Sequence, residues 1–305
     1  MITHPQNPSI GVLLFSLKGA VLQVIWKKVL FTILISSVVM ATHGTVYNYK
    51  VLLTATPFTM WGLTLAIFLG FRNTVAYQRF WEARTLWGEL LIATRNLTRQ
   101  ASSLLPELNR AERLELVNPL VGFAYTMRDH LRGDPPGADA RRLLDPAALE
   151  ALDGVGNRPN RLLGLLGRRF MDAARNAGAG EVIQTGFDAQ LTRMSIAFGG
   201  CERIKSTPIP YPYILMLHRV VHIYCFLLPF CLVDSIGWFT PVAVGVLAYT
   251  FFGLDALGDQ IADPFDTHPN DLPLNALCRG IEISAMELLG EPAPAPELPV
   301  DGVLL

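Results

Sequence analysis

Charged side chains are scarce in this sequence, and their scarcity excludes a typical soluble enzyme. Only 17% of the 305 residues are Asp, Glu, Lys or Arg, whereas 51% are hydrophobic and the mean hydropathy is positive. The formal net charge is −1, which gives no reason to expect nucleic acid as a partner. A chain of this composition is expected to lie partly in lipid and partly in water.

Catalytic and metal-binding motifs are also missing. The sequence contains no GxSxG, Walker, HExxH or strand-linked GxGxxG motif, and its four cysteines form no CxxC pair. His218 and His222 are one helical turn apart, but the Glu that follows the first His of a zinc protease motif is absent. A buried, hydrogen-bonded histidine pair is therefore the favoured interpretation, and neither an enzyme nor a cofactor is expected.

Long uncharged stretches predict four membrane-spanning helices. Residues 55–71 carry no charge and, with the preceding VLLT, are about 21 residues long, enough for a helix to cross a ~30 Å hydrocarbon core. The apolar face continues past Phe71 while charged residues appear on the other side, so this helix is expected to continue into water. The other apolar runs are 29–42, 214–233 and 238–254.

Residues 72–207 have the pattern of a cytosolic helical domain. Arg and Glu recur among Leu and Phe at helical spacing, and no strand-like alternation interrupts them. The predicted fold class is thus an all-α membrane protein with four transmembrane helices and a helical domain. The expected segments are 1–71 with the first two spans, 72–207, 208–258 with the last two spans, a cytosolic docking segment 259–290 and a disordered Pro-rich tail 291–305.

The distribution of Lys and Arg predicts the orientation in the membrane. Basic residues flank one end of the four spans, whereas the connectors 43–53 and 234–237 contain only Lys50. Cytoplasmic loops carry the excess of positive charge in membrane proteins. A multi-pass protein of the cell (inner) membrane is therefore expected, with both termini in the cytoplasm.

Two stripes of side chains follow the segment 55–71 at the i, i+4, i+8 spacing of one helix face. One stripe is small, which lets helices approach closely in lipid, and consists of Gly62, Ala66 and Gly70. The next is bulky and apolar, and consists of Leu63, Ile67 and Phe71. If copies of this helix packed through their small faces, the bulky stripe would form rings around a narrow, dewettable path. Ordinary core or lipid-facing packing is the alternative interpretation.

Three separated motifs occur in order along the chain. They are FRNTVAYQRFWEARTLWG from Phe71 to Gly88, GGCERIKSTPIPYPY from Gly199 to Tyr213, and ADPFDTHPNDLPLNALC from Ala262 to Cys278. Together with the hydrophobic layout of about residues 1–290, they resemble the bestrophin family, especially its bacterial members. The resemblance implies a homopentamer in which the second span of each subunit lines a central pore and the helical domain extends the conduit.

The resemblance also implies which residues form the site. The three neck residues of the family fall on Leu63, Ile67 and Phe71, the stripe that helical spacing selects, and a cytosolic aperture falls on Val182. An apolar neck acts by its diameter and by wetting, so passive flow of inorganic ions is implied. The other expected partners are further copies of the chain and membrane lipids.

The sign of the permeant ion is left open by the residues. Bestrophins are known mainly as chloride channels, and the positive edge of a ring such as Phe71 favours anions. Glu181, beside Val182, would instead place carboxylates at the aperture and attract cations. An anion (chloride) channel is the favoured interpretation; a monovalent cation (sodium or potassium) channel is the alternative, and a membrane scaffold or lipid-modifying enzyme is less favoured.

Calcium regulation is not expected from the acidic stretch after the last span. In animal bestrophins the equivalent stretch forms a calcium clamp, which Gln260, Asp263 and Asp271 match here. His268 and Pro269, however, stand where the clamp is acidic, and their presence removes hard oxygen ligands. The resemblance therefore implies a degenerate clamp and no bound metal.

Overall fold

The computed structural model describes residues 1, 19–46, 49–51 and 53–305. Within them the chain is helical apart from a hairpin of two short strands, β1 (Thr45–Val46) and β2 (Tyr49–Lys50), and one isolated bridge near the C-terminus. The chain forms two compact units. We call His4–Phe80 with Pro208–Asp263 the apolar unit, and Met1–Thr3, Trp81–Thr207 and Pro264–Leu305 the charged unit.

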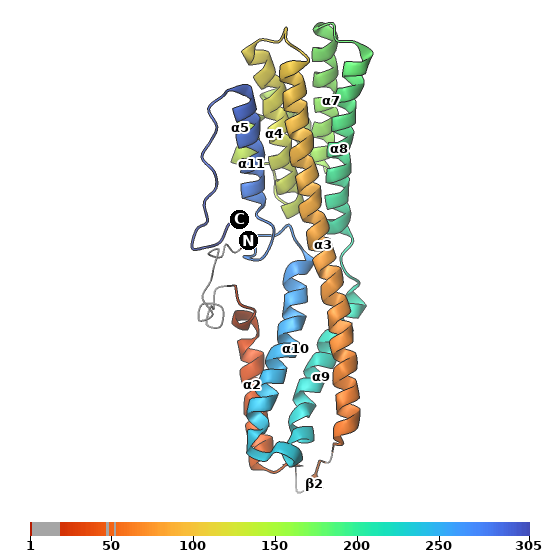
Figure 1. Cartoon of the computed structure of the whole chain (residues 1–305), viewed down its shortest axis with the longest axis vertical. Helices are drawn as coiled ribbons and strands as arrows, with labels where there is room; N and C mark the ends of the chain where they lie inside the picture. Colours follow the sequence, from red (N-terminus) through yellow and green to blue (C-terminus); the bar gives the residue numbers. More distant parts are fainter. Residues whose placement is uncertain (2–18, 47–48, 52) are drawn as a thin grey trace. The chain divides into compact units, whose positions relative to one another are not determined.

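The apolar unit contains four long helices that lie side by side (Figure 1). α2 and the helical stretch Tyr211–Ala262, which η1 divides into α9 and α10, are long and apolar enough to cross a membrane. The uncharged start of α3 is less apolar, because it includes Thr, Pro and Gly residues. The predicted count of four spans therefore stays a prediction. The helices are α2 (Leu22–Ala41), α3 (Ala55–Ser103), α9 (Tyr211–Ile236) and α10 (Thr240–Ala262), with the short 3₁₀ helix η1 (Gly237–Phe239) between the last two.

Helix α3 continues without a break far beyond its uncharged part. It is 49 residues long, so the predicted continuation past Phe71 is confirmed. The sequence predicts a division at Arg72, the first charge after the span, whereas the boundary between the two units of the structure falls between Phe80 and Trp81 of α3. The reason is that Arg72 is buried by ion pairs inside the apolar unit.

Proline affects where the later helices begin. The sequence predicts an extended stretch through Pro212, but α9 already starts at Tyr211 and includes Pro212 in its first turn. Proline is tolerated there because the first backbone N–H groups of a helix have no partner within it. Pro241 occupies the same kind of position at the start of α10.

The core of the apolar unit brings α9 close to α3. A Cβ on Gly62 would lie 2.5 Å from Oη of Tyr224, so only glycine admits the tyrosine at this position. Phe58 and Trp61 of α3 pack their rings 5.6 and 5.7 Å from that of Tyr224. The predicted helix neighbour of the small stripe is therefore α9 of the same chain at Gly62.

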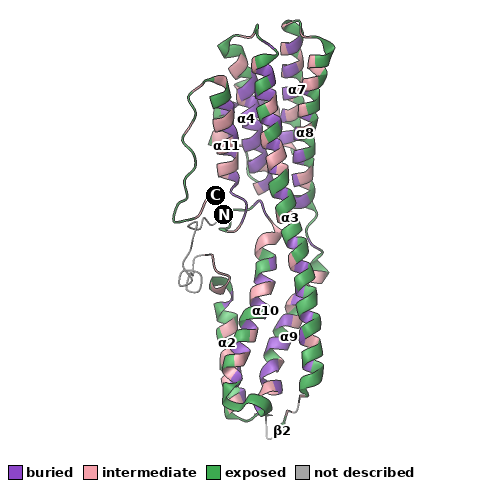
Figure 2. Ribbon diagram, in the orientation of Figure 1, coloured by how far each residue is buried: buried purple, intermediate pink, exposed green. Residues whose placement is uncertain are grey.

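The charged unit consists of the second part of α3 and six further helices. The Gly- and Pro-containing segments 133–139, 154–160 and 176–180 predict breaks in the helical pattern, and a helix ends at each of them. Asn109 caps α4 in a capping box with Glu112, and from Leu116 to Leu131 α4 is mostly buried at the centre of this unit (Figure 2). The helices are α4 (Arg110–Arg132), α5 (Ala138–Leu143), α6 (Pro146–Leu152), α7 (Arg158–Asn176), α8 (Glu181–Ser206) and α11 (Leu274–Leu289).

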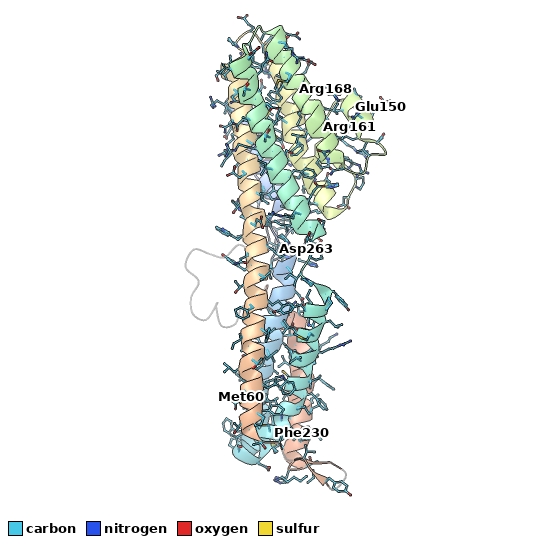
Figure 3. The ribbon with its side chains drawn as sticks, turned by 90° about the vertical axis from the view of Figure 1, so that its right-hand side faces the viewer. Met60, Glu150, Arg161, Arg168, Phe230 and Asp263 are labelled. Carbon is cyan, nitrogen blue, oxygen red and sulfur yellow. The ribbon has the colours of Figure 1, made fainter. Side chains whose placement is uncertain are left out.

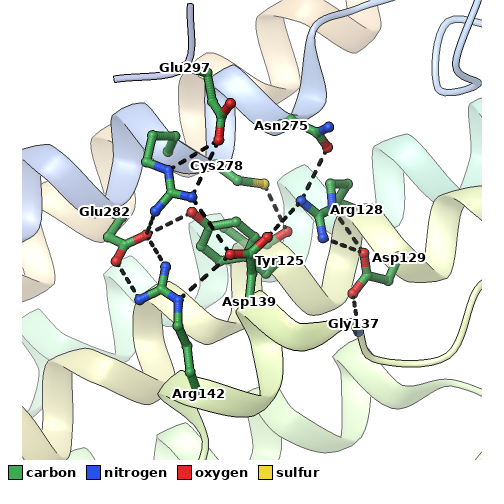
Figure 4. Close-up of polar contacts among 12 residues, drawn as sticks. Tyr125, Arg128, Asp129, Gly137, Asp139, Arg142, Asn275, Cys278, Glu282 and Glu297 are labelled. Atoms are coloured by element: carbon green, nitrogen blue, oxygen red, sulfur yellow. Dashed lines mark hydrogen bonds and ion pairs between the residues drawn. The ribbon is translucent and has the colours of Figure 1, made fainter. Parts of the chain in front are cut away.

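A buried polar network holds α11 against α4 and α5 (Figure 4). Glu282 accepts hydrogen bonds from the Tyr125 hydroxyl at 2.7 Å and from two nitrogens of Arg142 at 2.6 and 2.5 Å. Burial disfavours the Glu282 carboxylate, but the bonds from Arg142 and Tyr125 outweigh it and hold the pKa of Glu282 below its ordinary value. Arg142 and Arg168 belong to two Arg–Arg pairs among acidic residues, a pattern that predicts solvated helix faces. The prediction is wrong for Arg142 and confirmed for Arg168, which points outward from α7 (Figure 3).

The C-terminal segment 291–305 belongs to the charged unit and is extended chain. Glu291 pairs with Arg110, Glu297 lies 3.3 Å from a nitrogen of Arg279, and the carbonyl of Leu305 accepts from the Ala276 N–H at 3.0 Å. These contacts are polar and the segment contributes no buried large apolar side chain. Its predicted disorder in solution stays a prediction.

Candidate functional site

Three bulky apolar side chains of α3 face away from the rest of the described chain. Leu63, Ile67 and Phe71 are 64%, 48% and 63% exposed, whereas Leu65 and Leu69 on the opposite face are buried in the core. Figure 2 shows exposed residues along this part of α3. Because consecutive residues turn by about 100° around a helix, burying one face leaves the stripe outside. A continuous exposed apolar row of this kind indicates a contact with lipid or with another molecule.

The small stripe beside it is divided between two surroundings. Gly62 is buried under Tyr224, but Ala66 and Gly70 are exposed. A Cβ added to Gly70 would meet no atom within 4 Å. Small, open positions next to a bulky row leave room for the backbone of a second helix.

A buried arginine fixes the rotation of α3 at Phe71. The Arg72 side chain is 0% exposed, and its Nη1 lies 2.6 Å from a carboxylate oxygen of Asp255 on α10. Its Nη2 pairs with Asp259, one helical turn further along α10. Since Arg72 must point to α10 to keep these partners, the adjacent Phe71 must point elsewhere, and it is exposed.

Helices α3 and α10 approach closely at this cluster because residue 258 is glycine. A Cβ on Gly258 would lie 2.4 Å from Oδ1 of Asn73 and 3.5 Å from the Arg72 guanidinium. Asn73 donates from its amide to the carbonyl of Leu254 at 3.0 Å, and Arg72 also donates to the carbonyl of Asp255. Hydrogen bonds and ion pairs therefore join the two helices within an otherwise apolar unit.

His218 joins the same cluster from α9. Its Nδ1 hydrogen-bonds Asp255, and its Nε2 lies 3.3 Å from Asp259. His222 does not share this environment: it is exposed and its Nδ1 lies 2.6 Å from the carbonyl of His218. The prediction of a buried, hydrogen-bonded histidine pair therefore holds in part for His218, which bonds a neighbouring helix but is half-buried. It is wrong for His222, which is exposed and bonds the backbone of its own helix.

Metal binding at this cluster is opposed by its own arginine. His218, Asp255 and Asp259 form the one group of His, Cys, Asp or Glu side chains in the described residues that is close enough to share an ion. Arg72 already supplies the positive charge between the two carboxylates. The donor set therefore fits an ion-pair network better than a metal site.

The residues that match the calcium clamp of the family lie outside this cluster. Gln260 is in the last turn of α10, and Asp263 follows directly after it (Figure 3). Asp271 is buried in the loop before α11 and accepts a hydrogen bond from the His268 N–H at 2.8 Å. This bond makes Asp271 a loop-forming residue.

The aperture residues occupy the first turn of α8. Glu181 is the first residue of the helix, and Val182 is 87% exposed, more than any other large hydrophobic side chain among the described residues. Gly180 forms the N-cap without a side-chain hydrogen bond. An acidic side chain at a helix N-terminus is stabilised by the helix dipole, which explains Glu181 locally. The exposure of Val182 has no such local explanation.

Cys201 has the environment of a packing residue rather than of a nucleophile. It is fully buried, and burial raises the pKa of its thiol above the ordinary value. A Cβ on the neighbouring Gly200 would lie 2.7 Å from the side chain of Leu86, so α8 crosses α3 closely here within the charged unit. The small residues 199–201 of the sequence predict a close helix crossing, and this prediction is confirmed at Gly200.

These features define an all-helical membrane protein with an exposed apolar row on a helix anchored by buried charge. A family model described as bacterial/fungal bestrophin protein matches residues 1–287. The chain belongs to the bestrophin family, as its three motifs predict.

Named relatives and solved structures agree with this membership. The chain is 40% identical over 304 residues to the voltage-dependent anion channel-forming protein mll4386 of Mesorhizobium japonicum, covering 99% of this chain and 96% of that protein. It is 36% identical over 300 residues to the voltage-dependent anion channel-forming protein YneE of Escherichia coli K12, covering 98% of each. A crystal structure of a bacterial bestrophin homologue from Klebsiella pneumoniae matches with a TM-score of 0.84 and 36% identity, over 88% of this chain and 99% of that one.

Proposed function

We propose that this protein is a subunit of a passive anion channel whose neck is formed by Leu63, Ile67 and Phe71. The observation that carries the proposal is the exposed bulky row on α3, a helix whose opposite face is fixed by the Arg72 ion pairs. The relatives named as voltage-dependent anion channel-forming proteins align with nearly the whole chain, and they support the choice of anions.

Several copies of the chain are needed to enclose such a neck. We propose a homopentamer of four-span subunits in the cell (inner) membrane with both termini in the cytoplasm, as the bestrophin resemblance and the positive charges imply. The exposed small residues Ala66 and Gly70 would let neighbouring α3 helices approach closely. One row from each subunit would then face a shared axis.

The side chains of the row determine how the neck would work. Leu63 and Ile67 offer no polar atoms to replace the hydration shell of an ion, so the neck acts through its diameter and through wetting and dewetting. The ring edge of Phe71 carries partial positive charge and faces anions favourably when several edges form a ring. Val182, at the start of α8, would form the second, cytosolic constriction, with Glu181 beside it.

Ion selectivity tests this proposal directly. The purified protein in planar bilayers with asymmetric potassium chloride is expected to give a zero-current potential close to the chloride equilibrium potential. Repeating the measurement with potassium replaced by a large organic cation should leave that potential almost unchanged. A zero-current potential that follows the potassium gradient would instead establish the monovalent cation channel, in which the Glu181 carboxylates outweigh the neck.

A further inference from the structure

A groove open to the surroundings lies among α2, α9 and α10 of the apolar unit. Its volume is about 410 Å³, within the range of roughly 300–1,000 Å³ usual for ligand sites. Most of its walls are apolar, and three large side chains remain substantially exposed there: Phe31 at 62%, Ile223 at 49% and Phe226 at 50%. Thr32 adds little polarity, because its hydroxyl already donates to the Lys28 carbonyl at 2.8 Å.

One end of this groove is positively charged. Nζ of Lys28 lies 5.7 Å from the centre of the Phe252 ring, and the His222 ring lies 4.9 Å from the same ring. The two side chains therefore converge on one place from α2 and α9. Arg219, three residues before His222, is also exposed. An apolar groove with a cationic end fits a molecule with an apolar chain and an anionic head.

The positive charge at the groove is not neutralised within the described part of the chain. No acidic side chain there lies within ion-pair distance of Lys28, and the groove is lined by no Asp or Glu. The nearby carboxylates of Asp255 and Asp259 are taken by Arg72 and His218. The Lys28 ammonium therefore supplies a positive charge at this end of the groove.

Lys28 lies at the depth expected for a lipid headgroup. Counted from the opposite ends of their helices, Lys28 lies about 20 Å from Ala41 along α2, Arg219 about 25 Å from Ile236 along α9, and Asp255 about 22 Å from Thr240 along α10. Charge thus enters the helices at one level, which marks one boundary of the hydrocarbon core. The apolar walls of the groove continue from this level into the core.

We infer that the groove binds an acidic membrane phospholipid of the cytoplasmic leaflet. Its phosphate contacts Lys28, and one acyl chain lies along Phe31, Ile223 and Phe226. A neutral lipid would fill the same apolar walls but would leave the cationic end without a counter-charge. The site is separate from the exposed row on α3, because it is built from the other helices of the unit.

Native mass spectrometry of the full chain in detergent tests this inference with a defined lipid. The wild-type protein is expected to retain dioleoyl-phosphatidylglycerol in preference to dioleoyl-phosphatidylcholine. Lys28→Gln should weaken retention of phosphatidylglycerol about fivefold, since one Lys near an anionic membrane is worth about 1 kcal/mol. Lys27→Gln is the matched control: it removes the same charge from the preceding residue, whose side chain lies over Trp26 outside the groove.

A second variant tests the apolar walls without altering charge. Ile223→Trp is expected to fill the groove and to lower phosphatidylglycerol retention severalfold, while the exposed position keeps the fold intact. Equal losses from Lys27→Gln and Lys28→Gln would overturn the inference in favour of general surface attraction. Equal retention of the two lipids by the wild type, or no lipid retained because a neighbouring subunit covers the groove, would overturn it as well.

Discussion

Replacing Leu63, Ile67 and Phe71 together by alanine is expected to raise single-channel conductance severalfold and to weaken the preference for anions. Each substitution removes a bulky apolar group from an exposed position on α3, so the neck widens and wets more easily. The loss of Phe71 also removes the ring edges that favour anions. Single-channel recording in planar bilayers, with zero-current potentials in asymmetric salt, measures both effects.

A control uses another exposed apolar side chain of the same helix. Phe68 is 41% exposed and lies about a quarter turn away from the centre of the stripe. Phe68→Ala removes a bulky ring outside the stripe and should leave conductance within error of the wild type. An unaltered triple variant, or an equal change in the control, would show that the stripe is not the neck.

Arg72→Ala is expected to destabilise the protein by about 3–5 kcal/mol, because it leaves the buried Asp255 carboxylate without its main counter-charge. Arg72 is fully buried, so water cannot take the place of the guanidinium. The change is measured as a shift in the thermal unfolding temperature in detergent. This temperature is determined from the loss of the monodisperse peak on size-exclusion chromatography.

The same α3 helix offers a control for this substitution. Arg84 is exposed and lies in the charged unit, so Arg84→Ala should change stability by no more than about 0.5 kcal/mol. If Arg72→Ala unfolds at the wild-type temperature, the ion pairs do not hold α3 against α10 and the orientation argued for Phe71 loses its support.

The apolar row could be predicted from the sequence because it depends on local periodicity alone. Leu63, Ile67 and Phe71 share a face at i, i+4, i+8 whatever the rest of the chain does. The continuation of α3 and the helix breaks were predictable for the same reason, since they follow from nearby apolar spacing, glycine and proline. Family motifs then assigned Val182, which periodicity does not single out.

The supporting ion pairs could not be predicted, because their partners are far apart in the sequence. Arg72 and Asp255 are 183 residues apart, and no local rule pairs them. A signal was nevertheless present: Asp255 and Asp259 are one turn apart on an apolar helix, and charge in such a segment needs a partner. The ion pair of Arg142 could not be predicted for the same reason, since its partner Glu282 is 140 residues away.

Thiol modification at Ile67 tests most directly whether the exposed row of α3 lines the ion path. The four native cysteines are all buried, so a water-soluble methanethiosulfonate reagent reacts first at an introduced cysteine. Ile67→Cys and Ile223→Cys replace the same residue type at 48% and 49% exposure, the first on the row and the second on α9. Native mass spectrometry confirms that both variants keep the subunit number of the wild type.

The account predicts that the charged reagent blocks the current through the Ile67→Cys channel and leaves that of Ile223→Cys unchanged. Unimpeded current through an Ile67→Cys channel that mass spectrometry shows to be fully modified would contradict it.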